Sequence, residues 1–168
     1  QITDKNGLVY KFGLTTQSRQ DDPNNSLKIY RWMLEEIRDT NDNFIKYEYT
    51  KNVGQIYPLK IKYTGNGKTD GPFSIEFLTT ARKDLLTSYE SGFKISTTFV
   101  ISAIQKIYND TTSQQYYLAD MQQYSLNYTI GDNGKRYLLN KITHQGLDPL
   151  TTTLPPDKFE YQKNPGDW

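Results

Sequence analysis

Alternation of apolar and polar residues with a period of two is the feature that most constrains the fold of this chain. Ile45, Tyr47 and Tyr49, for example, alternate with Lys46 and Glu48. Such alternation is typical of β-strands with one packed face and one wet face. The pattern predicts strands over these stretches: Ser26–Leu34, Phe44–Thr50, Tyr57–Thr64, Ser74–Leu78, Phe93–Tyr108, Tyr116–Ile130, Arg136–Thr143 and Lys158–Gln162.

Short segments rich in Asn, Asp and Gly separate these stretches. Three of them, at residues 41–43, 65–67 and 132–134, supply residues that tolerate positive φ, which is the signature of tight hairpins. Ser91-Gly92 marks a further turn, and Pro155-Pro156 interrupts the ladder before the last strand. Residues 16–25 and 109–115 are expected to be polar loops. The sequence therefore predicts an all-β fold, an antiparallel meander of hairpins.

Two segments also contain good helix formers. Residues 32–38 place Met33, Leu34 and Ile37 at helical spacing, whereas the alternation of Tyr30, Trp32 and Leu34 favours a strand. We expect the strand, with a bulge near Glu35-Glu36 that returns the chain to register. Residues 80–86 form at most one helical turn.

The composition indicates a thin sheet. Only 35% of the 168 residues are hydrophobic, yet the chain has 14 Tyr and 7 Phe. Tyrosine packs its ring against a sheet while its hydroxyl remains solvated, so half-buried faces are expected instead of a thick apolar core. We expect residues 1–168 to be a single β-rich segment.

Charge and residue content exclude several function classes. The net charge is +1 with no basic cluster, which argues against nucleic-acid binding. No apolar run reaches the about 20 residues of a membrane helix, and the polar start at residues 1–10 lacks the apolar region of a signal peptide. We therefore expect an excerpt of a larger multi-domain protein. Zero Cys excludes disulfides and thiolate chemistry.

The sequence offers little support for a catalytic or metal-binding site. His144, the single histidine, has no nucleophile motif around it, so a strand-end polar role is expected. Asp39, Asn41 and Asn43 resemble the start of a calcium loop, but Phe44 and Thr50 stand where an EF-hand needs Gly and Glu, which favours a hairpin turn.

Paired carboxylates are the remaining enzymatic option, that of a glycosidase. No local feature marks two of them for one cleft, and Gly65, Gly67 and Gly71 lack dinucleotide-binding spacing. We predict no enzyme activity, and no catalytic, cofactor-binding or metal site. The carboxylate candidates are Glu35, Glu36, Glu48, Glu76, Glu90 and Asp120.

Several motifs follow one another along the chain: the opening Ile2–Gly13, the hairpin Tyr30–Tyr49, then Ile61–Asn66, Phe73–Phe77, Arg82-x-Asp84, Ser88–Phe93 and the closing Thr153–Tyr161. In this order they resemble SpvB/TcdB-like bacterial toxins and Rhs-repeat proteins, including the B components of insecticidal Tc toxins, and the hairpin resembles a YD repeat. Asp42 departs from this pattern, because the family usually has Gly there, and a run of repeated YD units is absent.

The resemblance implies a structural role in virulence. In such toxins, β-ribbons spiral into a hollow shell that encloses a toxic C-terminal polypeptide. A segment like this one would form the shell or lead into it, would be secreted or lie at the bacterial cell surface, and would have the rest of its parent chain and other toxin-complex subunits as partners. The alternative is an extracellular glycan- or protein-binding β module that uses exposed tyrosines such as Tyr116, Tyr117 and Tyr124.

Overall fold

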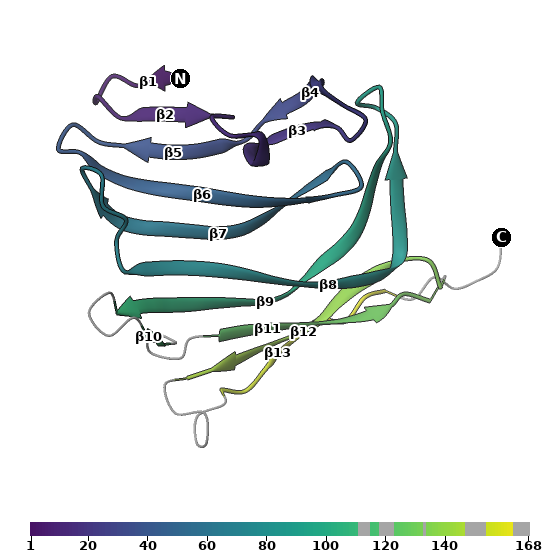
Figure 1. The fold of residues 1–168 in the computed structure, drawn as a ribbon. Helices are drawn as coiled ribbons and strands as arrows, with labels where there is room; N and C mark the ends of the chain where they lie inside the picture. The colour runs from purple at the N-terminus through teal and green to yellow at the C-terminus, as the bar shows by residue number, and fades with distance from the viewer. Residues whose placement is uncertain (111–114, 118–122, 133, 147–153, 163–168) are drawn as a thin grey trace.

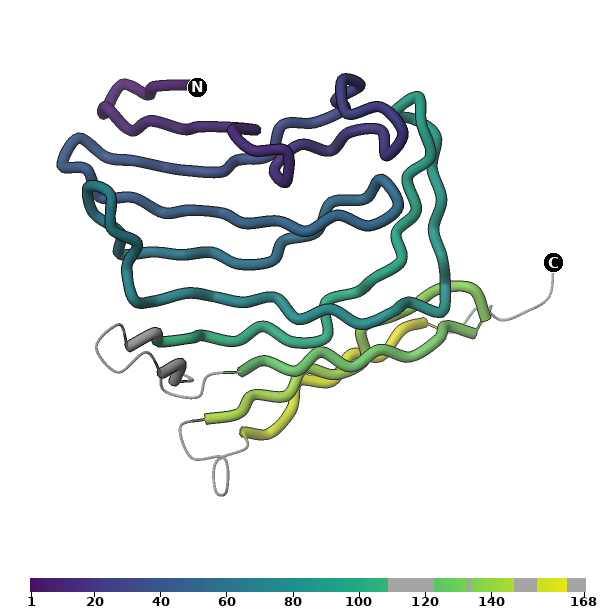
Figure 2. The backbone as a smooth tube through the Cα atoms, in the orientation of Figure 1, coloured from purple at the N-terminus to yellow at the C-terminus, as the bar shows by residue number. Residues whose placement is uncertain are grey.

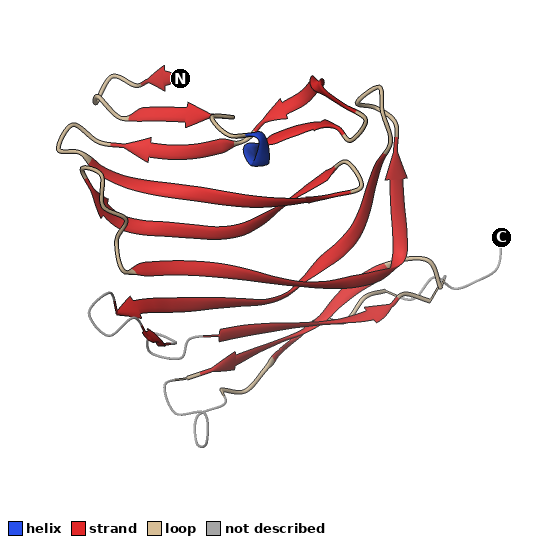
Figure 3. Ribbon diagram, in the orientation of Figure 1, coloured by secondary structure: helices blue, strands red, loops and turns tan. Residues whose placement is uncertain are grey.

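The computed structural model describes residues 1–168 except 111–114, 118–122, 133, 147–153 and 163–168. In the described part the only helix is the 3-10 turn η1 (Thr16–Ser18), and strands dominate (Figure 3). The strands are β1 (Ile2–Thr3), β2 (Val9–Phe12), β3 (Arg19–Asp22), β4 (Asn25–Trp32), β5 (Leu34–Arg38), β6 (Asn43–Asn52), β7 (Gln55–Asn66), β8 (Phe73–Ser88), β9 (Ile95–Asp110), β10 (Gln115–Tyr117), β11 (Gln123–Ile130), β12 (Tyr137–Gln145) and β13 (Asp157–Lys158).

One large antiparallel sheet organises the chain. Its strand order is β1-β2-β5-β6-β7-β8-β9-β11-β12-β13, β10 pairs with β9 beside this path, and β3 and β4 form a separate two-stranded sheet. Neighbours in the large sheet are mostly neighbours in sequence, so the predicted all-β meander of hairpins is confirmed. Figure 1 shows an open sheet, in which β11 to β13 run obliquely to the strands above them.

The predicted turns form where the sequence placed residues that tolerate positive φ. Asp42 has φ 63° in the β5–β6 turn, and Gly67 has φ 60° after β7. An Asp at positive φ is acceptable because its short polar side chain bonds locally, so this chain keeps the turn without the family's Gly. The β6–β7 turn has Val53 and Gly54 at φ 46° and 76°.

The segment from Trp32 to Arg38 is a strand, and the helical alternative is wrong. Lys11 pairs with Glu36 and Phe12 with Leu34, so Glu35 is the extra residue of a β-bulge. The predicted bulge is therefore confirmed. Met33 separates β4 from β5, and its backbone N–H donates to the carbonyl of Ser18 at 2.8 Å.

The longest hairpin, β8–β9, bends sharply. Ala81 pairs with Phe99 but Leu86 with Thr97, so four residues of β8 lie opposite one residue of β9. Beyond this bulge the hairpin turns upward at the right of Figures 1 and 2, as an arm across the ends of β6 and β7. The one-turn helix considered for residues 80–86 is wrong, and the predicted strand over residues 74–78 extends far beyond Leu78.

Hydrogen bonds hold this arm, residues 86–99, against the β6–β7 hairpin. The Tyr57 hydroxyl accepts hydrogen bonds from the backbone N–H groups of Thr98 at 2.8 Å and Phe99 at 3.3 Å. The N–H of Ser96 donates to the carbonyl of Val53 at 2.9 Å. The arm therefore closes one end of the sheet.

The loop predicted over residues 16–25 is wrong in part, because it contains η1 and β3. Its polar side chains find polar partners: Gln20 donates to the Gly54 carbonyl at 3.0 Å, and Lys51 donates to Asp21 at 2.6 Å. Gln20 and Asp21 are consequently buried although the segment has no apolar alternation.

Of the three C-terminal strand predictions, the second is confirmed as β12, whereas the first and the last are too long. The segment from Tyr116 to Ile130 divides into β10 and β11, with residues 118–122 outside the described part. The last strand ends at Lys158 instead of Gln162. After it, Phe159 donates its N–H to the Asn140 carbonyl at 3.0 Å, and the Tyr161 hydroxyl donates to the Leu139 carbonyl at 2.7 Å.

The apolar interior is thin, as the composition predicted. Most strand residues are half-buried, which is the expected result for a sheet without a second layer over each face. In the described residues, the buried hydrophobic side chains are Phe44, Tyr57, Phe93, Ala103 and Ile107.

Candidate functional site

The two faces of the large sheet differ in chemistry. Residues that pair across antiparallel strands project to the same face, so the register assigns each side chain. One face, here called the charged face, carries Lys11, Glu36, Lys46, Glu48, Lys60, Lys62 and Glu76. The other, here called the aromatic face, carries Tyr47, Ile61, Tyr63, Phe73, Ile75, Phe77, Ile104 and Tyr108.

Ion pairs join β6 to β7 on the charged face, with Asp70 between two of their lysines. Asp70, from the β7–β8 loop, accepts hydrogen bonds from Lys46 at 2.5 Å and Lys62 at 3.2 Å. Lys62 also pairs with Glu48 at 2.7 Å. The hydrogen bond from Lys46 is the main reason that the pKa of Asp70 lies below its ordinary value. Asp70 therefore remains charged at neutral pH.

Further ion pairs join β7 to β8 and β2 to β5. Lys60 lies 2.5 Å from Glu76, and Glu36 accepts from both Lys11 at 2.8 Å and Arg38 at 2.9 Å. The Arg38 guanidinium, with Lys11, outweighs burial and lowers the pKa of Glu36. Partly exposed pairs stabilise a fold by only about 0–1 kcal/mol each, so their main effect is to balance charge and fix register.

Stacked rings cross three strands on the aromatic face. The rings of Tyr63 and Phe73 stack with centroids 5.7 Å apart, and the Phe73 and Tyr108 centroids lie 5.2 Å apart. Lys106 places its ammonium 5.7 Å from the Phe73 ring. These residues are half-buried, so the face is apolar and only partly covered.

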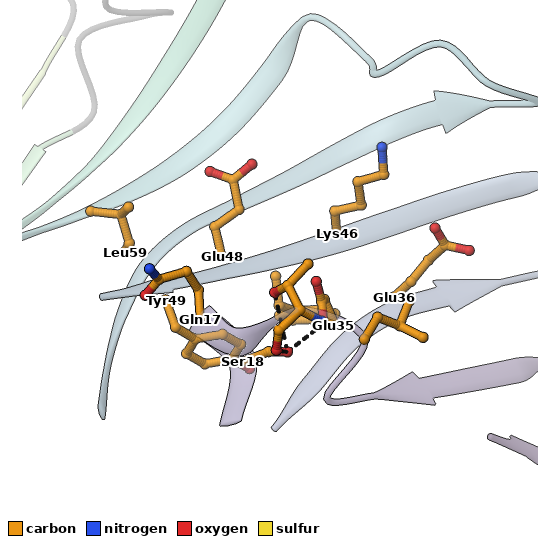
Figure 4. Close-up of a pocket in the computed structure, with 11 residues that line it drawn as sticks. Gln17, Ser18, Glu35, Glu36, Lys46, Glu48, Tyr49 and Leu59 are labelled. Atoms are coloured by element: carbon orange, nitrogen blue, oxygen red, sulfur yellow. Dashed lines mark hydrogen bonds between the residues drawn. The ribbon is translucent and has the colours of Figure 1, made fainter. Parts of the chain in front are cut away.

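A cavity of about 460 Å³ lies where η1 approaches β5 and β6. Its lining includes Glu35, Glu36 and Glu48, three of the carboxylates considered for glycosidase chemistry. Figure 4 shows that Glu36 and Glu48 project to one side of the strands, whereas Glu35 lies beside Ser18 on the other side. The structure therefore brings these residues near one another but does not aim them into one cleft.

Neither Glu35 nor Glu36 has the environment of a general acid. Burial would raise the pKa of Glu35, but hydrogen bonds from the Ser18 hydroxyl and the Thr15 N–H outweigh it and leave the pKa below its ordinary value. The pKa of Glu36 is also lowered. A glycosidase needs one carboxylic acid with a raised pKa, and this arrangement supplies the opposite.

The other sequence candidates are dispersed. Glu76 pairs with Lys60 on the charged face, Glu90 is exposed near the end of the arm, and Asp120 lies outside the described residues. His144, near the end of β12, packs edge-on against Tyr124 with ring centroids 4.3 Å apart. It has the position expected of a strand-end residue. The side chains of Tyr116 and Tyr117, which were considered for glycan binding, likewise lie outside the described part.

The calcium-like cluster is a turn. The Asp39 carboxylate accepts hydrogen bonds from the N–H groups of Asn41 and Asn43, both at 2.8 Å, and from the Asn43 side-chain amide at 2.8 Å. Its oxygens therefore face donors, whereas a cation site needs them free. Within the described residues, no group of three or more His, Asp or Glu side chains is placed to hold a metal ion.

The family motifs have structural roles in this fold. Phe44 lies over Gly65, where an added Cβ would approach two ring atoms to 2.4 Å, so Gly65 admits the aromatic ring. Arg82 donates two hydrogen bonds to Asp84, at 2.9 and 2.8 Å, inside the β8 bulge. The sequence motif marked this pair, but only the structure shows that it lies at the corner of the arm.

The first 71 residues match the family model described as SpvB, Salmonella virulence plasmid 65kDa B protein. A search of curated protein sequences finds no match. Within the described part of the chain, no helix has the length and apolar character needed to span a membrane.

Solved structures of bacterial toxins share the fold. The N-terminal domain of effector protein SpvB from Salmonella typhimurium strain LT2 superposes with a TM-score of 0.74 at 16% identity, over 86% of this chain and 60% of that one. The Photorhabdus luminescens Tc holotoxin pore gives 0.77 at 18% identity, over 94% of this chain and 10% of that one. TcdB2-TccC3 without its hypervariable C-terminal region gives 0.79 at 19% identity, over 95% and 10%.

This chain therefore spans little more than half of the SpvB domain and a tenth of the Tc toxin chains. With the family match over residues 1–71 and the shared all-β fold, the resemblance to SpvB/TcdB-like bacterial toxins is confirmed.

Proposed function

We propose that this chain is a non-catalytic structural segment of a secreted bacterial Rhs/Tc-like toxin, where it forms or leads into the β-shell around a toxic C-terminal polypeptide. The observation that carries the proposal is the open, mostly single-layer sheet with one charged and one aromatic face. A wall needs two unlike surfaces, because one contacts solvent and the other contacts what the wall encloses or packs against.

The state of the carboxylates supports a role without catalysis. Glu36, Glu48 and Glu76 are paired with cations, and Glu35 is held by the Ser18 hydroxyl and a backbone N–H. Acid–base catalysis needs a group whose pKa is tuned toward the working pH. The resolved shifts, for Glu35 and Glu36, go away from it.

The proposal includes the setting of the chain. Residues 1–168 form one β-rich segment of a larger multi-domain protein, and its partners are the rest of that protein and other subunits of a toxin complex. The coverage of only 10% of the Tc toxin chains supports this. Secretion follows from the same relationship, and the balanced surface charge supports partners other than nucleic acid.

Photo-crosslinking in the intact parent toxin tests the wall. A photoreactive amino acid replaces Tyr47 on the aromatic face in one variant and Lys60 on the charged face in a matched variant. We expect crosslinks to the enclosed polypeptide from one of the two positions only, because a wall separates inside from outside. Crosslinks from both positions, or from neither, would contradict the proposal, as would hydrolysis of a polysaccharide or peptide by the chain.

An extracellular glycan-binding module is the second candidate. The observation in its favour is the cavity beside η1, which Tyr47 and Tyr49 line on the aromatic face. Aromatic rings with nearby polar groups are suited to sugars. A glycan array probed with the chain decides this candidate, and the absence of any binder would eliminate it.

A further inference from the structure

We propose that the cavity between η1 and strands β5 and β6 binds an arginine side chain of a polypeptide, with the guanidinium at Glu35 and the aliphatic stem against Tyr47 and Tyr49. The inference is independent of the proposed wall, since a wall segment does not require this site and a binding module does not require a wall. It rests on the charge, walls and position of the cavity.

The charge of Glu35 has no cation to balance it. Its oxygen Oε2 accepts hydrogen bonds from the Ser18 hydroxyl and from the Thr15 N–H at 2.9 Å, both neutral donors. Among the described residues, no ion pair includes Glu35, in contrast to Glu36, Glu48 and Glu76. These neutral donors hold the carboxylate ionised, as its lowered pKa indicates.

The cationic side chains nearby are committed elsewhere. Lys46 also lines the cavity, but it projects from the opposite side of the strands (Figure 4) and donates to Asp70 at 2.5 Å. Arg19 donates to the backbone carbonyls of Gly13 at 2.7 Å and Leu14 at 3.2 Å. The carboxylate is therefore an anion open to an external donor, and we assign that donor to Oε1.

The walls of the cavity suit a long side chain with an apolar stem. Tyr47 and Tyr49 lie two residues apart on β6 and so project to one face, and Leu14 adds aliphatic surface. The Tyr49 hydroxyl donates to the Leu34 carbonyl at 2.7 Å, which fixes its ring. Aromatic faces attract guanidinium groups, which also match a carboxylate better than an ammonium does.

Arginine explains these features together better than a neutral sugar. A sugar would contact the rings and the polar groups, but it would not neutralise the negative charge of the partly buried Glu35 carboxylate. A guanidinium neutralises the charge, donates to Oε1 and stacks on tyrosine, while its stem covers apolar surface. The occupant is therefore an arginine side chain of a polypeptide segment.

NMR chemical-shift perturbation of the backbone amides of the 168-residue chain tests this site with a small peptide. The probe is acetyl-Ala-Arg-Ala-amide, and its neutral isostere carries citrulline in place of arginine. We expect saturable shifts at Thr15, Ser18, Tyr47 and Tyr49 with a dissociation constant of about 1 mM, typical of one side chain in a shallow site. The citrulline peptide should bind at least about tenfold more weakly.

Two matched variants identify the carboxylate responsible. Glu35→Gln keeps an acceptor for Ser18 and Thr15 but removes the charge, so binding should weaken about tenfold. Glu90→Gln removes an exposed carboxylate near the end of the arm, which does not line the cavity, and binding should remain unchanged. Equal binding of the citrulline peptide, undiminished binding by Glu35→Gln, preferential binding of a neutral oligosaccharide at the same residues, or no saturable shift would each overturn the site.

Discussion

The corner of the β8–β9 hairpin gives the sharpest prediction for stability. The Asp84 side chain is only 5% exposed. It accepts two hydrogen bonds from the Arg82 guanidinium, at 2.9 and 2.8 Å, and a third from the Tyr137 N–H at 2.7 Å. Asp84→Ala would leave a guanidinium and a strand N–H without an acceptor at the point where the arm turns.

The expected loss follows from these three bonds. A hydrogen bond to a charged group contributes about 1.5–3 kcal/mol, but the three are coupled and water can enter beside a single-layer sheet. We therefore expect Asp84→Ala to lower the free energy of unfolding by about 3 kcal/mol. For a chain of this size each kcal/mol corresponds to roughly 2–4 °C, so the Tm should fall by roughly 6–12 °C.

The pH dependence of the folding stability distinguishes the contribution of the Asp84 charge from that of its shape. The Arg82 hydrogen bonds, which outweigh burial, hold the pKa of Asp84 below its ordinary value of 3.8. A carboxylate with a lowered pKa in the fold stabilises it fully above the unfolded pKa, and the contribution is lost as pH falls through the folded pKa. The stability difference between the original chain and Asp84→Asn should therefore be constant at neutral pH and narrow below about pH 4.

Urea denaturation from pH 7 to acid provides both measurements. Glu90→Gln is the matched control, because Glu90 is an exposed carboxylate near the end of the same arm and its removal should change little. If Asp84→Ala costs less than about 0.5 kcal/mol, the range of ordinary surface substitutions, the corner is not held as described. A difference that does not narrow in acid would also refute the role of the charge.

Three further predictions concern the sheet and its charged face. Gly65→Ala should lower the Tm because its Cβ would lie 2.4 Å from ring atoms of Phe44, at a cost of about 1–3 kcal/mol. The double variant with Phe44→Leu should recover part of the loss in Tm. An unchanged Tm for Gly65→Ala would contradict the close contact between Gly65 and Phe44. Tyr57→Phe removes the β7 hydroxyl that accepts hydrogen bonds from the arm, so amide exchange at Thr98 should accelerate about fivefold, for roughly 1 kcal/mol. Unchanged exchange would mean that other contacts hold the arm. The pKa of Asp70, followed by NMR titration, should lie below 3.8 and rise when molar salt screens its two lysines; a pKa insensitive to salt would contradict the ion pairs.

The strands were predictable where one face is apolar. Alternation in residues 44–50 and 57–64 identified the centres of β6 and β7, because their Tyr and Ile side chains cover one face of the sheet. The turns at Asp42 and Gly67 were predictable from residue type, since few residues accept positive φ. The all-β meander could therefore be inferred from local pattern alone.

The errors occur where distant polar contacts decide the conformation. Strand β3 has no apolar alternation, and Gln20 and Asp21 are satisfied by Gly54 and Lys51, which are far away in sequence. The bulge in β8 contains residues of good helix propensity, but the Arg82 pair and the β9 ladder override them. The local sequence shows the Arg82-x-Asp84 motif, but it does not show the pairing with β9 or the partners of β3.

The candidate site was less predictable than the fold. The sequence provided six carboxylates without distinguishing them, since the distinction is which partner each one meets. Glu35 and Glu36 are adjacent in sequence, yet one meets a hydroxyl beside a cavity and the other meets two cations on the opposite face. The bulge at Glu35 and the position of η1 cause this difference, and both are tertiary features.

The unlike faces also explain how a sheet without a thick core keeps its register. A slip of one residue between β6 and β7 would move aromatic side chains to the charged face, which the pattern excludes. A slip of two residues in one direction keeps the faces but would remove Lys60 from its place opposite Glu48. A slip in the other direction would remove Gly65 from beneath the Phe44 ring. Individually weak ion pairs and one aromatic–glycine contact therefore specify together what a buried core specifies in a thicker protein.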